Sequence, residues 1–240
     1  MTLKAILFDF NGTIINDERI HKKLVYQIMI EENLRPVSGE YREVCLGKCD
    51  RIGLRELLSR RGRVVPESHL EGLIRKKSAA YQQKLTTLET LPIYSGAIAF
   101  LQQLKEADIF LGMVTGAVRS DVDFVLERAN MGEYFNIFVT GDEINTSKPD
   151  PYGYLLAIER INRQFPHLDV KPENCLAIED SPAGIEAAKR AKIQAIGIAH
   201  SYPFHMIQRQ ANWAVDSFEE IELERLQKFF ALGKETVLQS

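Results

Sequence analysis

The sequence lacks the features that would place the protein in a membrane, on nucleic acid or in an oxidising compartment. It has no run of 18 apolar residues, and its first predicted strand starts at the third residue, so we expect neither a spanning helix nor a signal peptide. The formal net charge is −3 without clustered positive charge, so no nucleic-acid or membrane partner is expected. The cysteines are few and scattered (Cys45, Cys49 and Cys175), which predicts a reduced, cytoplasmic protein.

Apolar runs typical of buried strands alternate with helical patterns over most of the 240 residues. The length suffices for one α/β domain with a small insert, or for one large domain. We predict strands at 3–10, 109–114, 135–140, 175–178, 195–199 and 213–215, and helices at 97–106, 121–130, 152–162 and 183–191. Such alternation predicts an α/β fold with an open parallel sheet and helices on both faces.

A block of about 75 residues after the first strand reads as helical throughout. Ile20, Leu24 and Ile28 recur every fourth residue, as on the apolar face of an amphipathic helix. Two further helices are predicted near 52–58 and 70–85, and the block contains no convincing strand. We therefore predict a core domain of residues 1–15 and 89–240 and a helical domain of residues 16–88, placed above the carboxyl edge of the sheet.

Polar side chains follow the predicted strands at the point where each strand ends. Asp9 follows the first strand, Thr115 the second, Lys148 lies in a proline-rich turn after the third, and Glu179 and Asp180 end the fourth. The carboxyl ends of parallel strands meet at one edge of a sheet, where open α/β folds build their sites. The sequence therefore predicts that these side chains form one site.

The chemistry of these residue types suits the handling of phosphate. A strand-end carboxylate such as Asp9 can attack phosphorus, although it can also cap the following turn. The pair Glu179 and Asp180 suits Mg²⁺, which prefers hard oxygen ligands, although Asp180 can equally cap the next helix. Lys148 would neutralise Asp9 and a substrate phosphate, and Thr115 with Gly116 offers a hydroxyl and a backbone N–H to a phosphate oxygen.

This set of motifs resembles the haloacid dehalogenase superfamily, in its branch of β-phosphoglucomutase-like proteins and phosphatases. The resemblance spans residues from Ile6 to about Ala199 and implies a Rossmann-like core with an inserted all-helical cap. It further implies an aspartyl-phosphate at Asp9, with Thr115 and Lys148 clamping the phosphate. The implied Mg²⁺ ligands are Asp9, the main-chain carbonyl of Asn11, Glu179 and Asp180.

Residue 11 departs from the pattern of the superfamily. In the usual motif, D-x-D-G-T, the second aspartate is the acid/base group of phosphatases and mutases, whereas this chain has Asn11. An amide cannot donate or take the proton, and such catalysis is worth about 10²–10⁴-fold. Three interpretations stay open: a slow or specialised hydrolase, an engineered trap, and a protein retained for binding.

The helical domain carries weaker signals for substrate binding. His21 stands where β-phosphoglucomutase has a histidine, and Lys77, followed by Tyr81, resembles that enzyme's cap lysine. Residues 46–51 roughly parallel its K-G-x-S-R loop, which suggests Arg51, although the loop's arginine would align with Asp50. The alternative for all of these is a solvated charged face.

We therefore predict a Mg²⁺-dependent phosphatase that acts on a small phosphorylated metabolite through Asp9. The resemblance also allows a sugar phosphomutase similar to β-phosphoglucomutase. The alternative outside the class of active enzymes is a catalytically weakened protein that binds a phosphorylated metabolite. The protein is expected to be a monomer or a weak homodimer.

Overall fold

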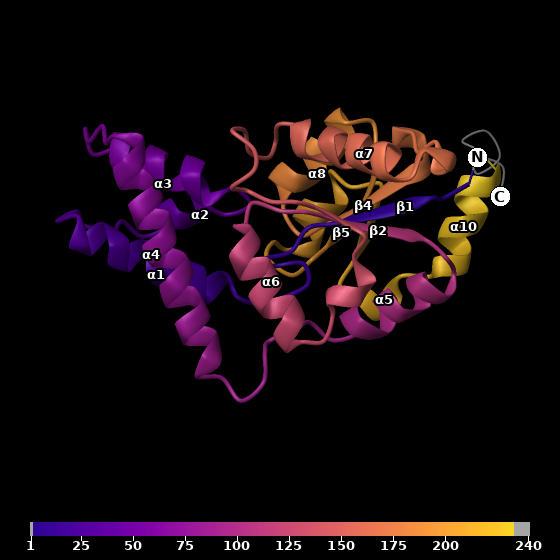
Figure 1. Cartoon of the computed structure of the whole chain (residues 1–240), viewed down its shortest axis with the longest axis horizontal. Helices are drawn as coiled ribbons and strands as arrows, with labels where there is room; N and C mark the ends of the chain where they lie inside the picture. The colour runs from indigo at the N-terminus through magenta and orange to yellow at the C-terminus, as the bar shows by residue number, and fades with distance from the viewer. Residues whose placement is uncertain (1, 233–240) are drawn as a thin grey trace.

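The core of the protein is a sheet of six parallel strands in the order β3-β2-β1-β4-β5-β6 (Figure 1). The computed structural model describes residues 2–232, so Met1 and residues 233–240 of the predicted core domain lie outside the described part. The strands are β1 (Ala5–Phe8), β2 (Phe110–Val114), β3 (Ile137–Val139), β4 (Cys175–Glu179), β5 (Gln194–Ile198) and β6 (Trp213–Val215). All neighbouring strands pair in parallel, which confirms the predicted open parallel sheet.

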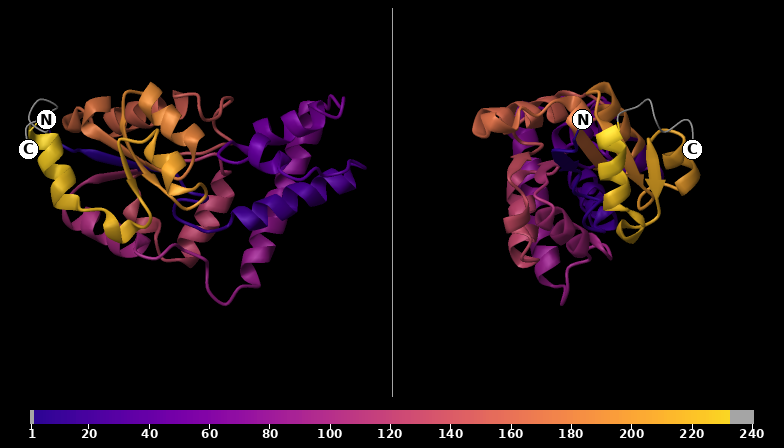
Figure 2. Two further views of the ribbon diagram at one scale, coloured as in Figure 1. Left: turned by 180° about the vertical axis from the view of Figure 1, so that it is seen from behind. Right: turned by 90° about the vertical axis from the view of Figure 1, so that its right-hand side faces the viewer.

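Helices cover both faces of this sheet. Figures 1 and 2 show α5 (Ala97–Glu106), α6 (Arg119–Arg128) and α10 (Leu223–Leu232) on one face. The other face carries α7 (Tyr152–Gln164) and α8 (Pro182–Arg190), with α9 (Phe204–Gln208) against β5 and β6. Short 3-10 helices lie at Gly132–Tyr134, Pro166–Leu168, Pro172–Asn174 and Phe218–Glu220. No helix among residues 2–232 is long and apolar enough to cross a membrane.

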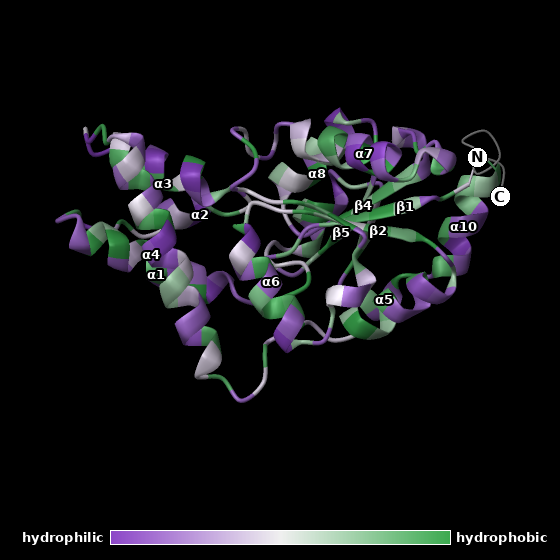
Figure 3. Cartoon of the chain, in the orientation of Figure 1, coloured by the Kyte–Doolittle hydropathy of each residue, from purple (hydrophilic) through white to green (hydrophobic). Residues whose placement is uncertain are grey.

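The strands are apolar because both of their faces are covered (Figure 3). In β1 the side chains of Ile6 and Phe8 join the apolar cluster that includes Phe100 of α5, and all are buried. Ala5 and Leu7 point to the opposite face and join the cluster of α7 and α8. This alternation fixes the register of β1, so the first polar residue after the strand emerges at the carboxyl edge.

The helical insert lies between β1 and β2 in the sequence and beyond one end of the sheet in space (Figure 1). It consists of α1 (Glu18–Glu31), α2 (Glu40–Val44), α3 (Asp50–Ser59) and α4 (Glu67–Thr86). Its buried side chains, such as Val25, Leu57 and Leu70, form an apolar cluster of their own. The three predicted helices are present, and α2 is an additional one.

The two connections between the insert and the sheet run side by side. Ile15 pairs with Ile93 in an antiparallel bridge, and the Asn16 backbone N–H donates to the Pro92 carbonyl at 2.8 Å. The segment that leads into the insert, just before α1, therefore lies beside the segment that leads out of it, between α4 and α5. The division into two domains at residues 16 and 88 stays a prediction.

Candidate active site

The strand ends bring the predicted residues together at the carboxyl edge of the sheet. Asp9 directly follows β1, and its backbone N–H donates to Ile178 of β4 at 3.0 Å, which continues the ladder to the site. Thr115 directly follows β2, while Glu179 ends β4 and Asp180 follows it. Lys148 comes from the loop between β3 and α7. All five side chains are buried, as expected for a site that excludes water.

Lys148 is the cation at the centre of this group. Its Nζ lies 2.6 Å from Asp9 Oδ1 and 2.6 Å from Glu179 Oε1. Burial opposes the charge on Lys148, but the carboxylates of Asp9 and Glu179 outweigh it and raise its pKa above the usual value. Thr13 donates a hydrogen bond to Asp9 Oδ2 at 3.2 Å, so both oxygens of Asp9 are oriented by neighbours.

Three carboxylates surround one point of the site. Asp9, Glu179 and Asp180 each offer an oxygen, and these oxygens lie within 4.8 Å of one another. Burial raises the pKa of Glu179 to about 7, and burial together with the charge of Asp9 raises the pKa of Asp180 well above its usual value. Glu179 Oε1 also accepts from the Tyr154 hydroxyl at 2.5 Å, whereas Oε2 is buried without a partner among the described residues. The cluster therefore has excess negative charge and an unused oxygen.

Two glycines allow the acidic pair to pack this closely. Gly12 has φ +77°, and a Cβ at this position would overlap with the Asp180 carboxylate. A Cβ at Gly184, in the first turn of α8, would likewise overlap with the Glu179 carboxylate. Both acids are held against bare backbone, so their positions are fixed by the fold.

A cavity lies between the strand ends and the insert, with a free volume of about 40 Å³. Six of the predicted residues line it: Asp9, Asn11, His21, Lys77, Thr115 and Gly116. The volume admits a few water molecules but no phosphorylated metabolite. The insert and the core are thus closed over the site in this structure.

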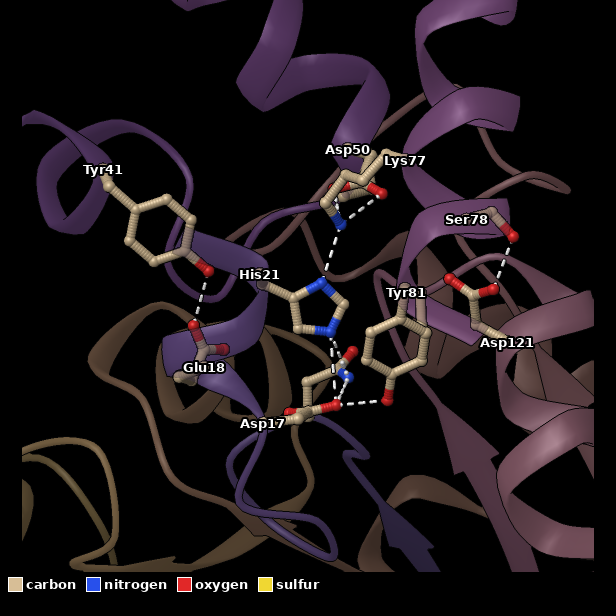
Figure 4. A network of polar contacts seen from close by, with 12 residues as sticks. Asp17, Glu18, His21, Tyr41, Asp50, Lys77, Ser78, Tyr81 and Asp121 are labelled. Atoms are coloured by element: carbon tan, nitrogen blue, oxygen red, sulfur yellow. Dashed lines mark hydrogen bonds and ion pairs between the residues drawn. The ribbon is translucent and has the colours of Figure 1, made fainter. Parts of the chain in front are cut away.

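The insert contributes an ordered polar network to the cavity wall (Figure 4). Lys77 Nζ lies 2.8 Å from His21 Nδ1 and forms an ion pair of 2.7 Å with Asp50. Glu18 accepts from the Tyr41 hydroxyl at 2.6 Å, and burial raises the pKa of Glu18. His21 and Lys77 are thus buried partners in the wall, which argues against a solvated charged face for these two residues.

Arg51 lies away from the site, whereas Gly116 lies at it. Arg51 pairs with Glu67 and Glu71 on α4 and lines a separate hollow, so it is not brought together with Asp9. Gly116 lines the cavity, and it also packs against the backbone of Lys48 and Cys49. The predicted role of Arg51 therefore has no support in its contacts.

Sequence reasoning did not select four residues that line or organise this site. They are Asp17, Glu18, Asp50 and Tyr154. For Asp50 a signal existed, because the resembled loop places its arginine at that position. Asp17 and Glu18 lie at the start of the predicted helical domain, but their spacing to Asp9 contains no recognisable metal or acid/base pattern. Tyr154 is one of many aromatic residues in helices, and only its contact with Glu179 distinguishes it.

The fold and the strand-end cluster together define an α/β protein with an open parallel sheet, whose buried acidic site is covered by a helical insert. The family model of haloacid dehalogenase-like hydrolases matches residues 6–198, and the chain belongs to this family. The prediction of the superfamily, and of its β-phosphoglucomutase- and phosphatase-like branch, is confirmed.

Several proteins of similar sequence are named as phosphatases. The phosphorylated carbohydrates phosphatase of Thermotoga maritima is 30% identical over 200 residues, which cover 83% of this chain and 87% of that protein. The β-phosphoglucomutase of Bacillus subtilis is 28% identical over 203 residues, 84% of this chain and 85% of that protein. The predicted enzyme class, a phosphatase of this superfamily, is confirmed.

Solved structures resemble the whole chain. An aspartate-to-asparagine variant of CbbY from Rhodobacter sphaeroides, in complex with xylulose-(1,5)bisphosphate, has a TM-score of 0.77 and 26% identity. The match covers 92% of this chain and 96% of that one. The fold class is thereby confirmed.

Proposed function

We propose that this protein is a Mg²⁺-dependent phosphatase that hydrolyses a small phosphorylated metabolite through an aspartyl-phosphate at Asp9. One observation carries the proposal. Lys148 and Thr13 orient the Asp9 carboxylate, which lines the closed cavity. The same carboxylate lies close to the carboxylates of Glu179 and Asp180. The names of the relatives, which include phosphatases of phosphorylated carbohydrates and sugars, support a substrate of this class.

The residues around Asp9 fit a divalent cation. Three carboxylates face one ammonium group, that of Lys148, so the cluster lacks two positive charges when all its carboxylates are ionised. Glu179 Oε2 is buried and has no partner in the described residues, as expected of an oxygen reserved for a ligand. Asp9, Glu179, Asp180 and the main-chain carbonyl of Asn11 would hold the ion. When bound, Mg²⁺ supplies charge neutralisation and orientation of the phosphate.

Asp9 performs the first displacement of the proposed reaction. Its carboxylate oxygen forms a bond to phosphorus while the bond from phosphorus to the leaving oxygen breaks. Lys148 and the hydroxyl of Thr115 hold the phosphoryl oxygens during this transfer and stabilise their charge. In the second displacement, water attacks phosphorus and releases Asp9 and inorganic phosphate.

Asn11 limits which substrates react well. Its side chain cannot protonate the leaving oxygen, so esters with acidic leaving groups should react faster than simple alkyl phosphates. Aryl, acyl and anomeric phosphates belong to the favoured group. A phosphomutase is less compatible with Asn11, because both of its transfers involve a hydroxyl that gains or loses a proton.

The helical insert acts as a cap in this proposal. The free volume of about 40 Å³ is too small for a sugar phosphate, so substrate must enter while the insert is displaced. The paired connections at Asn16 and Pro92 are the natural hinge, because they alone lead into and out of the insert. Closure then brings His21 and Lys77 over the substrate and excludes water.

A panel of phosphorylated metabolites, together with an aryl phosphate, tests the proposed function. We expect phosphate release that requires Mg²⁺ and stops in excess chelator. Asp9→Asn should abolish release, whereas Asp123→Asn, at an exposed position of α6, should not. Hydrolysis that persists in Asp9→Asn or in chelator would contradict the proposal.

A further inference from the structure

Asn11 is tied to a carboxylate buried behind the cavity wall. Its Nδ2 donates a hydrogen bond to Asp17 Oδ2 at 2.7 Å. Asn11 lines the cavity, whereas Asp17 is fully buried and is absent from the lining. Because the amide nitrogen contacts Asp17 and also lies 3.0 Å from His21 Nε2, the amide oxygen is the end of the side chain left for the cavity. The hydrogen bond therefore decides which end of the amide the substrate meets.

Asp17 does not cap the helix that it precedes, although capping is the usual role of an aspartate directly before a helix. It immediately precedes α1 as the N-cap residue, yet its side chain makes no capping hydrogen bond. Its Oδ2 instead accepts hydrogen bonds from the Tyr81 hydroxyl, at 2.5 Å, and from Asn11 Nδ2. The same oxygen lies 3.2 Å from His21 Nε2 (Figure 4). Its Oδ1 is buried without a partner among residues 2–232. A buried carboxylate so arranged costs free energy, which argues for a role beyond helix capping.

The same carboxylate fixes the ring of His21. Lys77 Nζ, which is paired with Asp50, can only donate, so His21 Nδ1 accepts from it. His21 Nε2 lies 3.2 Å from Asp17 Oδ2 and 3.0 Å from Asn11 Nδ2, so the imidazole, the carboxylate and the amide meet at one point. The ring is further held by stacking on Tyr81, with centroids 4.5 Å apart. Orientation of Asn11 and orientation of His21 thus depend on one side chain.

The amide at position 11 and the carboxylate at position 17 are complementary. An aspartate at residue 11 would face the Asp17 carboxylate at about the present 2.7 Å, and two like charges at that distance repel strongly. The reversed pair, with aspartate at 11 and asparagine at 17, restores one donor and one acceptor. The identities of the two residues are therefore coupled.

We propose that Asp17 is a positioning residue for the phosphatase reaction, holding the Asn11 amide with its oxygen toward the cavity and His21 in one ring orientation. This inference rests on the proposed function. Asn11 then acts as a fixed hydrogen-bond acceptor that aligns the attacking water, which donates to its amide oxygen, without taking a proton itself.

Two sets of variants test the inference by steady-state hydrolysis of an aryl and an alkyl phosphate with Mg²⁺. In the first set, Asp17→Ala should lower kcat by about tenfold or more with KM within about twofold, as for an interaction that matters in the transition state. Asp17→Asn keeps an acceptor oxygen in the same place and should retain more kcat than Asp17→Ala. Lys23→Ala, at an exposed position of α1, is the matched control.

In the second set, the pair is reversed. Asn11→Asp combined with Asp17→Asn should exceed Asn11→Asp alone by about tenfold or more in kcat, because the repulsion is removed. It should also exceed wild type on the alkyl phosphate by about 10²-fold, the scale of one positioned acid/base group. Thermal melts show which variants are folded, and if Asp17→Ala is not, this second set decides the question.

The outcomes separate this inference from the proposed function. Equal kcat for Asn11→Asp and the double variant, or wild-type kcat and KM in a folded Asp17→Ala, would overturn the positioning role alone. A wild type that hydrolyses neither ester with Mg²⁺ would overturn the proposed function, and the inference with it.

Discussion

Substitution of Gly116 by alanine probes closure of the insert over the site. Gly116 lies at the carboxyl end of β2, in the loop to α6, where an added Cβ would stand 2.9 Å from the backbone N and Cα of Cys49 and from the carbonyl carbon of Lys48. These are backbone atoms of the loop between α2 and α3, so no side chain can rotate to relieve the overlap. Gly116 has no unusual φ, and alanine is therefore acceptable to its own backbone. The perturbation acts on the contact between core and insert.

The size of the effect follows from this overlap. Overpacking by one methyl group costs about 1–3 kcal/mol when the surroundings cannot adjust. If that cost falls on the closed form alone, the balance between closed and open forms shifts by about 5- to 150-fold. In the proposed function only the closed form brings His21 and Lys77 over the substrate, so kcat/KM should fall by a similar factor. Stability should change less, since the open form relieves the clash.

The assay is Mg²⁺-dependent hydrolysis of an aryl phosphate, together with thermal melts. Gly132→Ala is the matched control, because a Cβ at this exposed glycine would meet no atom within 4 Å. We expect wild-type kinetics for Gly132→Ala and the predicted loss for Gly116→Ala. Wild-type kcat/KM in Gly116→Ala would refute the view that close contact between insert and core is needed for the reaction.

Three further predictions concern the metal and the leaving group. Burial raises the pKa of Glu179 from 4.5 to about 7, so in the metal-free protein this group favours the folded state most below pH 4.5 and that contribution is lost as the pH rises to about 7. Protons should therefore compete with Mg²⁺, so that the increase in Tm caused by Mg²⁺ is larger near pH 8 than near pH 6. Glu179→Gln should reduce this difference, and the raised pKa of Asp180 accounts for what remains. Asp180→Ala should weaken Mg²⁺ binding, measured by calorimetry, by about tenfold or more, and unchanged affinity would exclude Asp180 as a ligand. Wild type should prefer aryl over alkyl phosphates by at least about 10²-fold in kcat/KM, and a ratio near one would show that another group protonates the leaving oxygen.

The site at the strand ends was predictable because it depends on a simple rule of parallel sheets. Apolar runs located the strands, and the first polar residues after them, Asp9, Thr115 and Glu179, necessarily meet at one edge. Helices with clear periodicity were also predicted, and the predicted bounds of 97–106 agree with α5, whereas the ten-residue α10 was missed. The short α2 and α9, of five residues each, offered too little periodicity to be recognised.

The contribution of the insert was harder to predict because it depends on helix rotation and on side-chain choice. One residue along a helix turns the side chain by about 100°, so Asp50 contacts Lys77 while Arg51 faces Glu67 of α4. Asp17 stands directly before α1, and only the structure shows that its carboxylate accepts from Asn11. Such side-chain contacts leave no signal in the hydrophobic pattern.

The central claim, covalent catalysis by Asp9, is tested most directly by trapping the intermediate. Wild type is mixed with an aryl phosphate and Mg²⁺, quenched in acid within the first turnovers, digested and examined by mass spectrometry. The account predicts one added phosphoryl group on the peptide that contains Asp9, its loss on longer incubation, and its absence in Asp9→Asn and in excess chelator. Hydrolysis at the normal rate with no phosphoryl group on this peptide, or with one on another residue, would contradict it.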